Sequence, residues 1–238
     1  MSLSEKKRQI FNNRRLLREV YKNWYEQIKL NLATGGKILE IGSGVGLTKE
    51  FINCITSDII KNEFINRQED ACNLSFNNFS LDNIIGIDIF HHLNSPDNFL
   101  KEAARVLRSG GRIVLVEPYL SPVSLMARKL FHHEKINFTR LAKPGDNPEE
   151  ANLASPTILF KKDWQSVNFK IIEIRYQDVL AYPLSGGFSK IKFTPNFLAT
   201  AIIKLDKYIN KLGWLNRLAG FKMIIVLEKI HISCRLDS

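Results

Sequence analysis

The sequence predicts an α/β fold: a doubly wound, mostly parallel sheet of seven strands, with an N-terminal helix and a helical insertion before the last strand. Three observations predict it. Short apolar runs alternate with helix-compatible segments, which favours a parallel sheet covered by helices on both faces. A glycine-rich turn, "GSGVG", follows the first of these runs. The run "GRIVLVE" is apolar almost throughout, as in a strand buried on both faces.

The N-terminal segment from Glu5 to Leu30 predicts one amphipathic helix, because its apolar residues recur at helical spacing. Seven later segments predict strands. They are residues 37–41, 53–57, 63–66, 80–89, 111–117, 169–176 and 221–230.

Two further helices are marked by their ends. Ser95 and Pro96 supply an N-cap and a first-turn proline, and Gly110 marks the expected C-cap region. A second helix is predicted from Pro195 to Leu212, closed by Gly213. Its expected apolar stripe is Leu198, Ile202, Leu205, Ile209 and Leu212. The stripe predicts packing on the core or on a second copy of the chain, with contact to an anionic membrane as the alternative.

The 238 residues predict a single domain. Its parts are the N-terminal helix (1–34), a ligand-binding half with the glycine turn (35–118) and an acceptor-side half (119–238), with the helical insertion at about 190–218.

Composition and charge limit the setting. The formal net charge is +10, and the basic residues gather near the N-terminus and between residues 190 and 222. Such blocks favour anionic partners, although a solvated basic surface explains them equally well. Three scattered cysteines, at positions 54, 72 and 234, suit neither a disulfide framework nor a zinc site. With no apolar signal segment, the sequence predicts a cytoplasmic protein, at most peripheral to the inner face of the membrane.

The glycine turn selects the kind of ligand. Gly42, Gly44 and Gly46 follow a strand and open a helix-compatible run, as in nucleotide-binding sheets. Leu47 stands where the dinucleotide fingerprint would place its third glycine. Glu40, just before the turn, would repel a pyrophosphate. The pattern therefore favours a ligand that carries positive charge.

At this point the sequence resembles the class I S-adenosylmethionine-dependent methyltransferases with a type 11-like domain. Their first motif has the form E-x-G-x-G-x-G, here "EIGSGVG". Three further stretches match: "SDI" at 57–59, "EDACNLSFNNFSLDNI" at 69–84 and "IFHHLNSPDNFLKEAARVLRSGGRIVLVEP" at 89–118.

The resemblance implies a Rossmann-like sheet and S-adenosyl-L-methionine as cofactor. It implies that Asp58 binds the ribose hydroxyls and that Asp70 and Ala71 meet the adenine. The expected cofactor-binding residues are Glu40, Gly42, Ser43, Gly44, Gly46, Asp58, Ile59, Asp70, Ala71 and Asp88. Only eleven residues separate Asp58 from Asp70, too few for a full helix and strand, so a loop is expected there.

Candidate catalytic residues are His91, Glu117 and His133. Methyl transfer is an in-line displacement, so a general base is needed only when the acceptor must lose a proton. A histidine after the fourth strand also packs structurally in many sheets, and that alternative stays open for His91. No metal ligands are expected.

We expect a methyltransferase of bacterial type that acts on a small molecule, a glycan or a lipid precursor. A nucleic-acid methyltransferase is the second hypothesis, disfavoured because "DIFHH" stands in place of an "NPPY"-type motif. The third is a non-catalytic module that binds the cofactor or a partner. A homodimer and a peripheral membrane contact both remain open.

Overall fold

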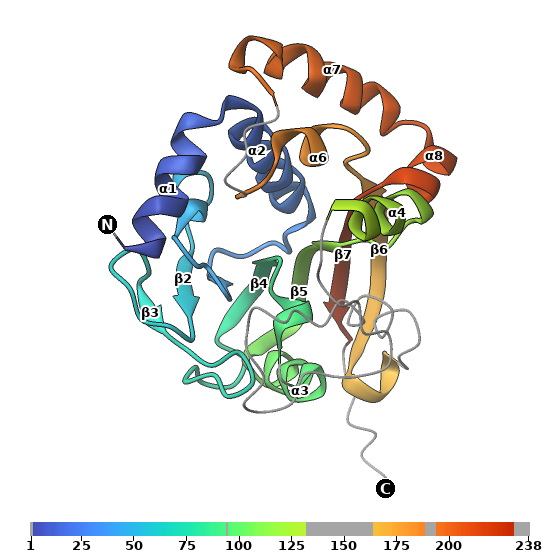
Figure 1. Cartoon of the computed structure of the whole chain (residues 1–238). Coiled ribbons are helices and arrows are strands. Elements are labelled where there is room, and N and C mark those ends of the chain that lie inside the picture. Colours follow the sequence, from blue (N-terminus) through green and yellow to red (C-terminus); the bar gives the residue numbers. More distant parts are fainter. Residues whose placement is uncertain (1, 94, 132–163, 189–193, 231–238) are drawn as a thin grey trace, which may run out of the picture.

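The computed structural model describes residues 2–93, 95–131, 164–188 and 194–230. Its centre is a seven-stranded sheet with the order β3-β2-β1-β4-β5-β7-β6 (Figure 1). The strands are β1 (Ile38–Glu40), β2 (Ile55–Asp58), β3 (Arg67–Gln68), β4 (Leu81–Ile87), β5 (Leu107–Pro118), β6 (Phe169–Gln177) and β7 (Lys222–Lys229). β7 runs antiparallel to β5 and to β6, and the other strand pairs are parallel. The predicted fold class, with its seven strands, is confirmed.

The helices of the described residues lie on both faces of this sheet (Figure 1). The α-helices are α1 (Leu3–Asn13), α2 (Arg15–Asn31), α3 (Pro96–Val106), α4 (Pro122–Phe131), α6 (Ala181–Ser185), α7 (Ala199–Ile209) and α8 (Gly213–Ala219). The 3-10 turns are η1 (Leu47–Glu50), η2 (Phe90–His92), η3 (Gln165–Val167) and η4 (Asn196–Leu198). None of the helices in these parts of the chain is long and apolar enough to cross a membrane.

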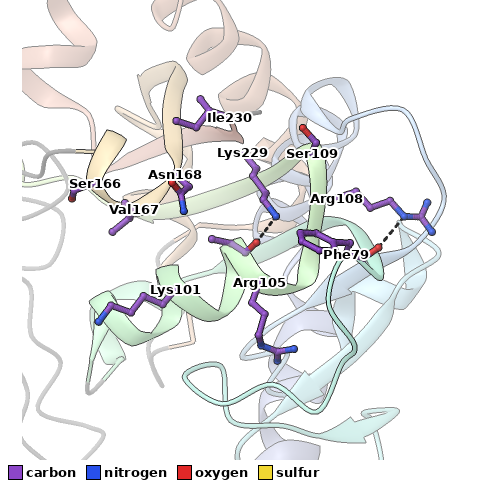
Figure 2. A pocket seen from close by; sticks show the side chains of 11 residues that line it. Phe79, Lys101, Arg105, Arg108, Ser109, Ser166, Val167, Asn168, Lys229 and Ile230 are labelled. Atoms are coloured by element: carbon purple, nitrogen blue, oxygen red, sulfur yellow. Dashed lines mark hydrogen bonds between the residues drawn. The ribbon is translucent and has the colours of Figure 1, made fainter. Parts of the chain in front are cut away.

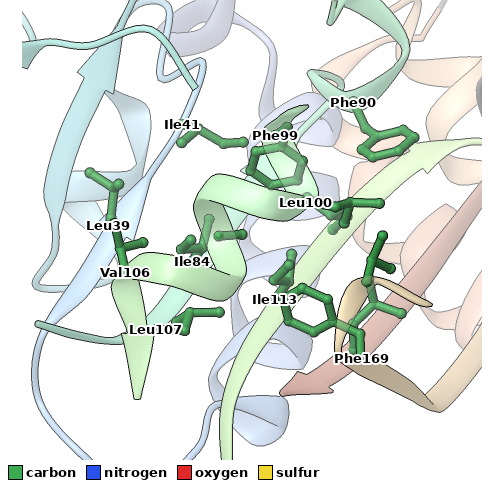
Figure 3. Close-up of a cluster of buried hydrophobic side chains, with 14 of the residues drawn as sticks. Leu39, Ile41, Ile84, Phe90, Phe99, Leu100, Val106, Leu107, Ile113 and Phe169 are labelled. Atoms are coloured by element: carbon green, nitrogen blue, oxygen red, sulfur yellow. The ribbon is translucent and has the colours of Figure 1, made fainter. Parts of the chain in front are cut away.

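Alternation along the central strands divides the core into two halves. Ile113 and Leu115 of β5 join the half covered by α3, drawn in Figure 3, whereas Val114 and Val116 join the half covered by α1 and α2. This follows from the period of two in a strand, which sends neighbouring side chains to opposite faces. The apolar run in "GRIVLVE" is therefore explained by burial on both sides.

The N-terminal segment forms two helices, so the prediction of one helix is wrong. The break lies at Arg14, whose backbone is extended (φ −112°, ψ 94°). The Arg14 side chain is buried and donates from Nη1 to the carbonyl of Gly187, 3.0 Å away. The change of direction lets α2 bury Leu17, Val20 and Trp24 against the sheet.

The helix before β5 begins as predicted and ends differently. Ser95 is the N-cap and accepts from the backbone N–H of Asn98. The helix ends at Val106, and Gly110, with φ +73°, lies within β5 instead of at the C-cap. The pairing of Leu81 with Leu107 explains the early end, because the chain joins the sheet at once.

The helix predicted from Pro195 to Leu212 is shorter. α7 starts at Ala199 and stops at Ile209, and Gly213 opens α8 instead of closing the previous helix. The inward side of α7 carries Ala199 and Asp206. Asp206 turns inward because its Oδ1 accepts from the backbone N–H of Leu180, 2.7 Å away. The predicted leucine stripe consequently lies largely outside the core.

The region between β2 and β3 is a loop, as its length predicts, and β3 has only two residues. The parallel strands β1, β2, β4 and β5 end at the same edge of the sheet, and antiparallel β7 begins there, with Pro118 paired to Lys222. This carboxyl edge gathers the residues predicted for the site.

Candidate functional site

The glycine turn after β1 is built from three left-handed residues. Gly42, Gly44 and Gly46 have φ values of 62°, 50° and 64°. A Cβ at Gly42 would clash with the side chain of Ile89, and one at Gly46 would clash with the carbonyl oxygen of Phe64. A Cβ at Gly44 would meet nothing within 4 Å. The middle glycine therefore faces open space, in which a ligand has room.

The turn is fastened to the end of β2. The N–H of Ser43 donates to the carbonyl of Ser57 at 2.8 Å, and the N–H of Ser57 donates to Ser43 Oγ at 3.0 Å. Asp58 accepts from the N–H of Gly44 at 2.8 Å and from that of Ile60 at 2.9 Å. The Asp58 carboxylate is thereby fixed beside the open glycine.

Glu40 ends β1 and is buried beneath the turn. It hydrogen-bonds through Oε1 to the hydroxyl of Thr48, which also lies 2.8 Å from the Tyr25 hydroxyl. Its other oxygen, Oε2, is buried and has no hydrogen-bond partner among the described residues. Burial, partly offset by hydrogen bonds from Ser43 and Thr48, raises the pKa of Glu40 to about 7. A cationic group that reached Oε2 would favour the ionised form.

Asp88, at the end of β4, is held in a left-handed conformation (φ 54°) and pairs with Lys222. Lys222 is 1% exposed, and its Nζ lies 4.4 Å from the ring centre of Tyr182 and 5.2 Å from that of Trp24. Burial would raise the pKa of Asp88, but Lys222 outweighs it, so that pKa lies below its usual value. Burial lowers and Asp88 raises the pKa of Lys222, which ends above its usual value. Both groups are charged.

His91 and Glu117 form a buried pair at the same edge. His91 Nδ1 lies 2.6 Å from Glu117 Oε2, and Glu117 Oε1 accepts from the backbone N–H groups of Ile89 and Phe90. Glu117 is fully buried and His91 is 4% exposed. The carboxylate thus positions the imidazole and the η2 turn together. The third catalytic candidate, His133, lies outside the described residues.

The remaining predicted cofactor-binding residues follow β2 and β3. Ile59 comes just after the end of β2 and is 59% exposed. Asp70 is exposed and accepts from the N–H of Cys72 at 2.8 Å, which makes a local turn. Ala71 packs partly against the core. Asp70 therefore caps a turn through Oδ1, and its side chain is exposed beside that turn.

A cavity of about 890 Å³ lies at the opposite edge of the sheet, and none of the predicted site residues that the structure describes lines it (Figure 2). Lys229 turns back to donate to the carbonyls of Ala104 and Leu107, and Arg105 binds Glu102 and the carbonyls of Leu74 and Phe76. These two cations of the cavity, Lys229 and Arg105, are thus bound to groups of the protein itself. Size alone does not make it the functional site, which needs converging polar groups.

Several residues of the carboxyl edge had not been predicted. They are Thr48, Tyr25, Asp178, Tyr182 and Lys222. The sequence offered a signal for one of them, Lys222, which begins the apolar run "KMIIVLE". A lysine in a buried strand is almost never left without a partner, so a charged partner could have been expected. The others contact the edge only through the tertiary fold.

The charges of this edge fit a cation better than a phosphate. Glu40 and Asp58 lie at the turn, Asp88 follows the neighbouring strand β4, and the buried cation Lys222 is paired with Asp88. Within the described residues no group of three or more histidine, cysteine or acidic side chains is arranged to hold a metal ion.

Comparisons with known proteins agree with this geometry. Residues 39–115 match the family model described as "Methyltransferase domain". The methyltransferase GfsG of Streptomyces halstedii is 26% identical over 111 residues, which are 37% of this chain and 40% of GfsG. The matched segment thus spans well under half of that relative.

Solved structures share the fold. An S-adenosylmethionine-dependent methyltransferase from Archaeoglobus fulgidus is 21% identical, with 89% of this chain and 94% of that one covered and a TM-score of 0.53. Geranyl diphosphate C-methyltransferase from Streptomyces coelicolor, in complex with Mg²⁺, geranyl diphosphate and S-adenosyl-L-homocysteine, is 11% identical (94% and 84% covered, TM-score 0.58). The [4+2]-cyclase SpnF is 12% identical (89% and 82% covered, TM-score 0.57).

S-adenosylmethionine is named with a solved structure of this fold, and the open space at Gly44 and the Glu40 Oε2 that is unpartnered among the described residues fit its hydroxyl-bearing and cationic parts. Over residues 39–115 the chain is thus similar to a methyltransferase domain, as its three-glycine motif predicted.

Proposed function

We propose that this protein transfers a methyl group from S-adenosylmethionine to a small organic acceptor. The observation that carries the proposal is the group of three acids around a left-handed glycine turn, one of which has a buried oxygen without a partner. Bound S-adenosylmethionine supplies an electrophilic methyl carbon. The protein's part is to bind the donor, to orient the acceptor and to keep water out.

On the donor side, Glu40 takes the cationic end and Asp58 takes the ribose hydroxyls. Asp58 suits this role because two backbone N–H groups already fix its carboxylate. Ile59 offers an exposed apolar side chain next to it, and Asp70 and Ala71 border the place expected for the base. Gly42, Ser43 and Gly46 shape the turn that brings the backbone close to the ligand.

On the acceptor side, His91 is the candidate base and Glu117 its positioning residue. Because Glu117 accepts at Nδ1, a neutral His91 presents Nε2 as the acceptor of a proton. The base acts only if the acceptor is a hydroxyl or another group that must lose a proton. His133 stays a prediction from the sequence.

The acceptor that we propose is small and partly apolar. The rings of Tyr21, Trp24 and Tyr182 pack together beside the Asp88–Lys222 pair, and the half-buried Tyr182 is the one of the three that an apolar molecule could reach. Geranyl diphosphate is the ligand in one structure of the same fold. A glycan or lipid-linked precursor remains within the proposal. Cys54 and Cys72 are free thiols, in keeping with a bacterial cytoplasmic location.

A second candidate function is that the protein binds S-adenosylmethionine but does not transfer its methyl group. It is favoured by the likeness to a [4+2]-cyclase, which shows that this fold also serves an enzyme named for another reaction. Nucleic-acid methylation is the remaining alternative, and no described feature favours it.

The test is donor-dependent labelling. Protein and S-adenosylmethionine with a tritiated methyl group are incubated with an ultrafiltered small-molecule extract, with RNA, or with buffer alone. We expect label to enter the small-molecule fraction, and Asp58→Ala to abolish both the labelling and calorimetric binding of S-adenosylhomocysteine. Label in RNA, or donor binding without transfer to any fraction, would sink the proposal. NAD serves as the inert ligand control.

A further inference from the structure

The outer surface of the helical insertion is unusually apolar. Seven large apolar side chains between residues 197 and 218 are exposed, and we call this surface the α7–α8 face (Figure 1). It consists of Phe197, Leu198, Leu205, Tyr208, Leu212, Trp214 and Leu218. Phe197, Tyr208 and Trp214 are 78%, 66% and 67% exposed. Scattered single apolar residues need no explanation, but a contiguous group marks an interaction site.

The helix spacing sorts these residues into a stripe. Leu205, Tyr208 and Leu212 follow one another at intervals of three and four, which places them on one side of α7 and the turn after it. Ala199 and Asp206 hold the opposite, inward side. The stripe therefore points away from the sheet.

A basic stripe runs beside the apolar one. Lys204, Lys207 and Lys211 are exposed and repeat the same intervals, each one residue ahead of its apolar counterpart. Arg217, exposed on α8, adds a fourth cation. The sequence from 195 to 219 contains one acid, Asp206, which is 3% exposed and bonded to Leu180 and Asn210. No acidic side chain of this stretch balances the lysines at the surface.

These charges discriminate between the occupants of the face. Two copies packed symmetrically through this face would bring two sets of lysines into one interface with no exposed acid of the stretch to pair them, which is unfavourable. A nucleic acid would match the lysines but would have no use for the exposed leucines. An anionic bilayer matches both, because acyl chains take the leucines, headgroups take the lysines, and tryptophan and tyrosine prefer the interface between them.

The face lies at the carboxyl edge, where the candidate site is. α8 ends at Ala219, and Lys222, the partner of Asp88, begins β7 three residues later. Tyr119, after β5, donates its hydroxyl to the carbonyl of Arg217 at 3.1 Å. A partner bound to the α7–α8 face would therefore lie next to the carboxyl edge of the sheet, where the candidate site is.

We infer that the α7–α8 face docks on an anionic lipid bilayer and holds the protein there as a peripheral protein. The helix lies in the headgroup region with its apolar stripe inward. The inference does not depend on methyl transfer, since its test measures only partition between water and lipid.

The test is co-sedimentation of the full chain with vesicles of phosphatidylcholine alone or mixed with phosphatidylglycerol. We expect binding to the mixed vesicles only, weakened by salt. A triple substitution, Lys204→Gln with Lys207→Gln and Lys211→Gln, should lower the partition coefficient about a hundredfold, at the typical strength of lysine near anionic lipid. The double substitution Leu205→Ser with Trp214→Ser removes apolar side chains from the face and should abolish binding to the mixed vesicles.

The matched control is Lys6→Gln with Lys7→Gln and Lys22→Gln, which removes the same charge from three exposed lysines of the N-terminal helices. It should keep most of the binding. Equal losses in both triple variants would mean that net charge alone drives adsorption and would overturn the inference. A dimer in sedimentation velocity that Trp214→Ser dissociates would also overturn it, and so would binding to RNA lost with the same lysines.

Discussion

The buried carboxylate of Glu40 is the residue on which donor recognition depends most. One of its oxygens is bound to Thr48, and the other is buried with no partner in the part of the chain that the structure describes, an arrangement that costs free energy until a ligand satisfies it. A protein retains such a group where it serves binding. The same residue is therefore costly in the free protein and useful in the complex.

Glu40→Gln tests this directly. Glutamine keeps the shape and removes the negative charge, so the affinity for S-adenosylmethionine should fall, by about tenfold or more for a lost charge-assisted hydrogen bond of roughly 1.5–3 kcal/mol. Calorimetry at pH 8 measures the change. Thr48→Val, which removes the hydroxyl and leaves the carboxylate, is the matched control and should cost less affinity. Equal affinity of Glu40→Gln and the wild-type protein would contradict the assignment.

The Asp88–Lys222 pair allows a second prediction at the residue scale. The side chain of Lys222 is 2% exposed and that of Asp88 is 29% exposed, so removal of Asp88 strands a buried cation, and removal of Lys222 strands a carboxylate that water partly reaches. We expect Asp88→Asn to cost about 3 kcal/mol of unfolding free energy and Lys222→Met to cost less.

The double variant with both substitutions should recover part of that loss, since neither charge is then buried alone. Urea unfolding of the four proteins gives the coupling energy. Strictly additive losses would show that the two charges do not interact as their contact implies.

The glycine turn is the element that joins the three acids, and its glycines differ in what they require. All three are left-handed, a conformation that costs a residue with a Cβ roughly 1–2 kcal/mol. At Gly46 a Cβ would also clash with the carbonyl of Phe64, whereas at Gly44 it would enter open space.

Gly46→Ala should therefore lower the melting temperature more than Gly44→Ala. Gly44→Ala should instead weaken S-adenosylhomocysteine binding beyond its small effect on stability, because its methyl group occupies the space we assign to the ligand. Differential scanning fluorimetry and calorimetry of the two variants separate the effects. Tight binding by Gly44→Ala would place the ligand elsewhere.

The elements that sequence predicts well are those whose information is local. The glycine turn, the Ser95 N-cap and the strands β4 and β5 follow from short motifs and periodicity. The helix of the insertion exists but is shorter than predicted, and its predicted stripe does not face inward, because the buried Asp206 holds the inward side through a contact with Leu180. Lys222, far from Asp88 in sequence, could be joined to it only by the fold.

At the scale of the whole molecule, the free protein carries buried acids whose pKa values are raised. Burial raises the pKa of Asp178 to about 7, with help from Asp206 and against a hydrogen bond from Trp24, and burial raises that of Glu40 to about 7 as well. In the unfolded chain both ionise near pH 4. Between about pH 4 and 7 the folded protein therefore holds protons that the unfolded chain has released.

Folding stability should consequently fall as the pH rises from 5 to 7.5, because the full contribution of these acids is present only below their unfolded pKa values and is lost through their folded ones. Each group accounts for on the order of 4 kcal/mol at most. Urea unfolding at several pH values should show a shallower decline for Asp178→Asn and for Glu40→Gln than for the wild type. Saturating S-adenosylmethionine should remove the Glu40 part and leave the Asp178 part, since the donor's cation favours the ionised Glu40 alone. A decline that the donor leaves unchanged in the wild-type protein would separate Glu40 from the donor site and place the cationic end of the ligand at Asp58 or Asp88 instead.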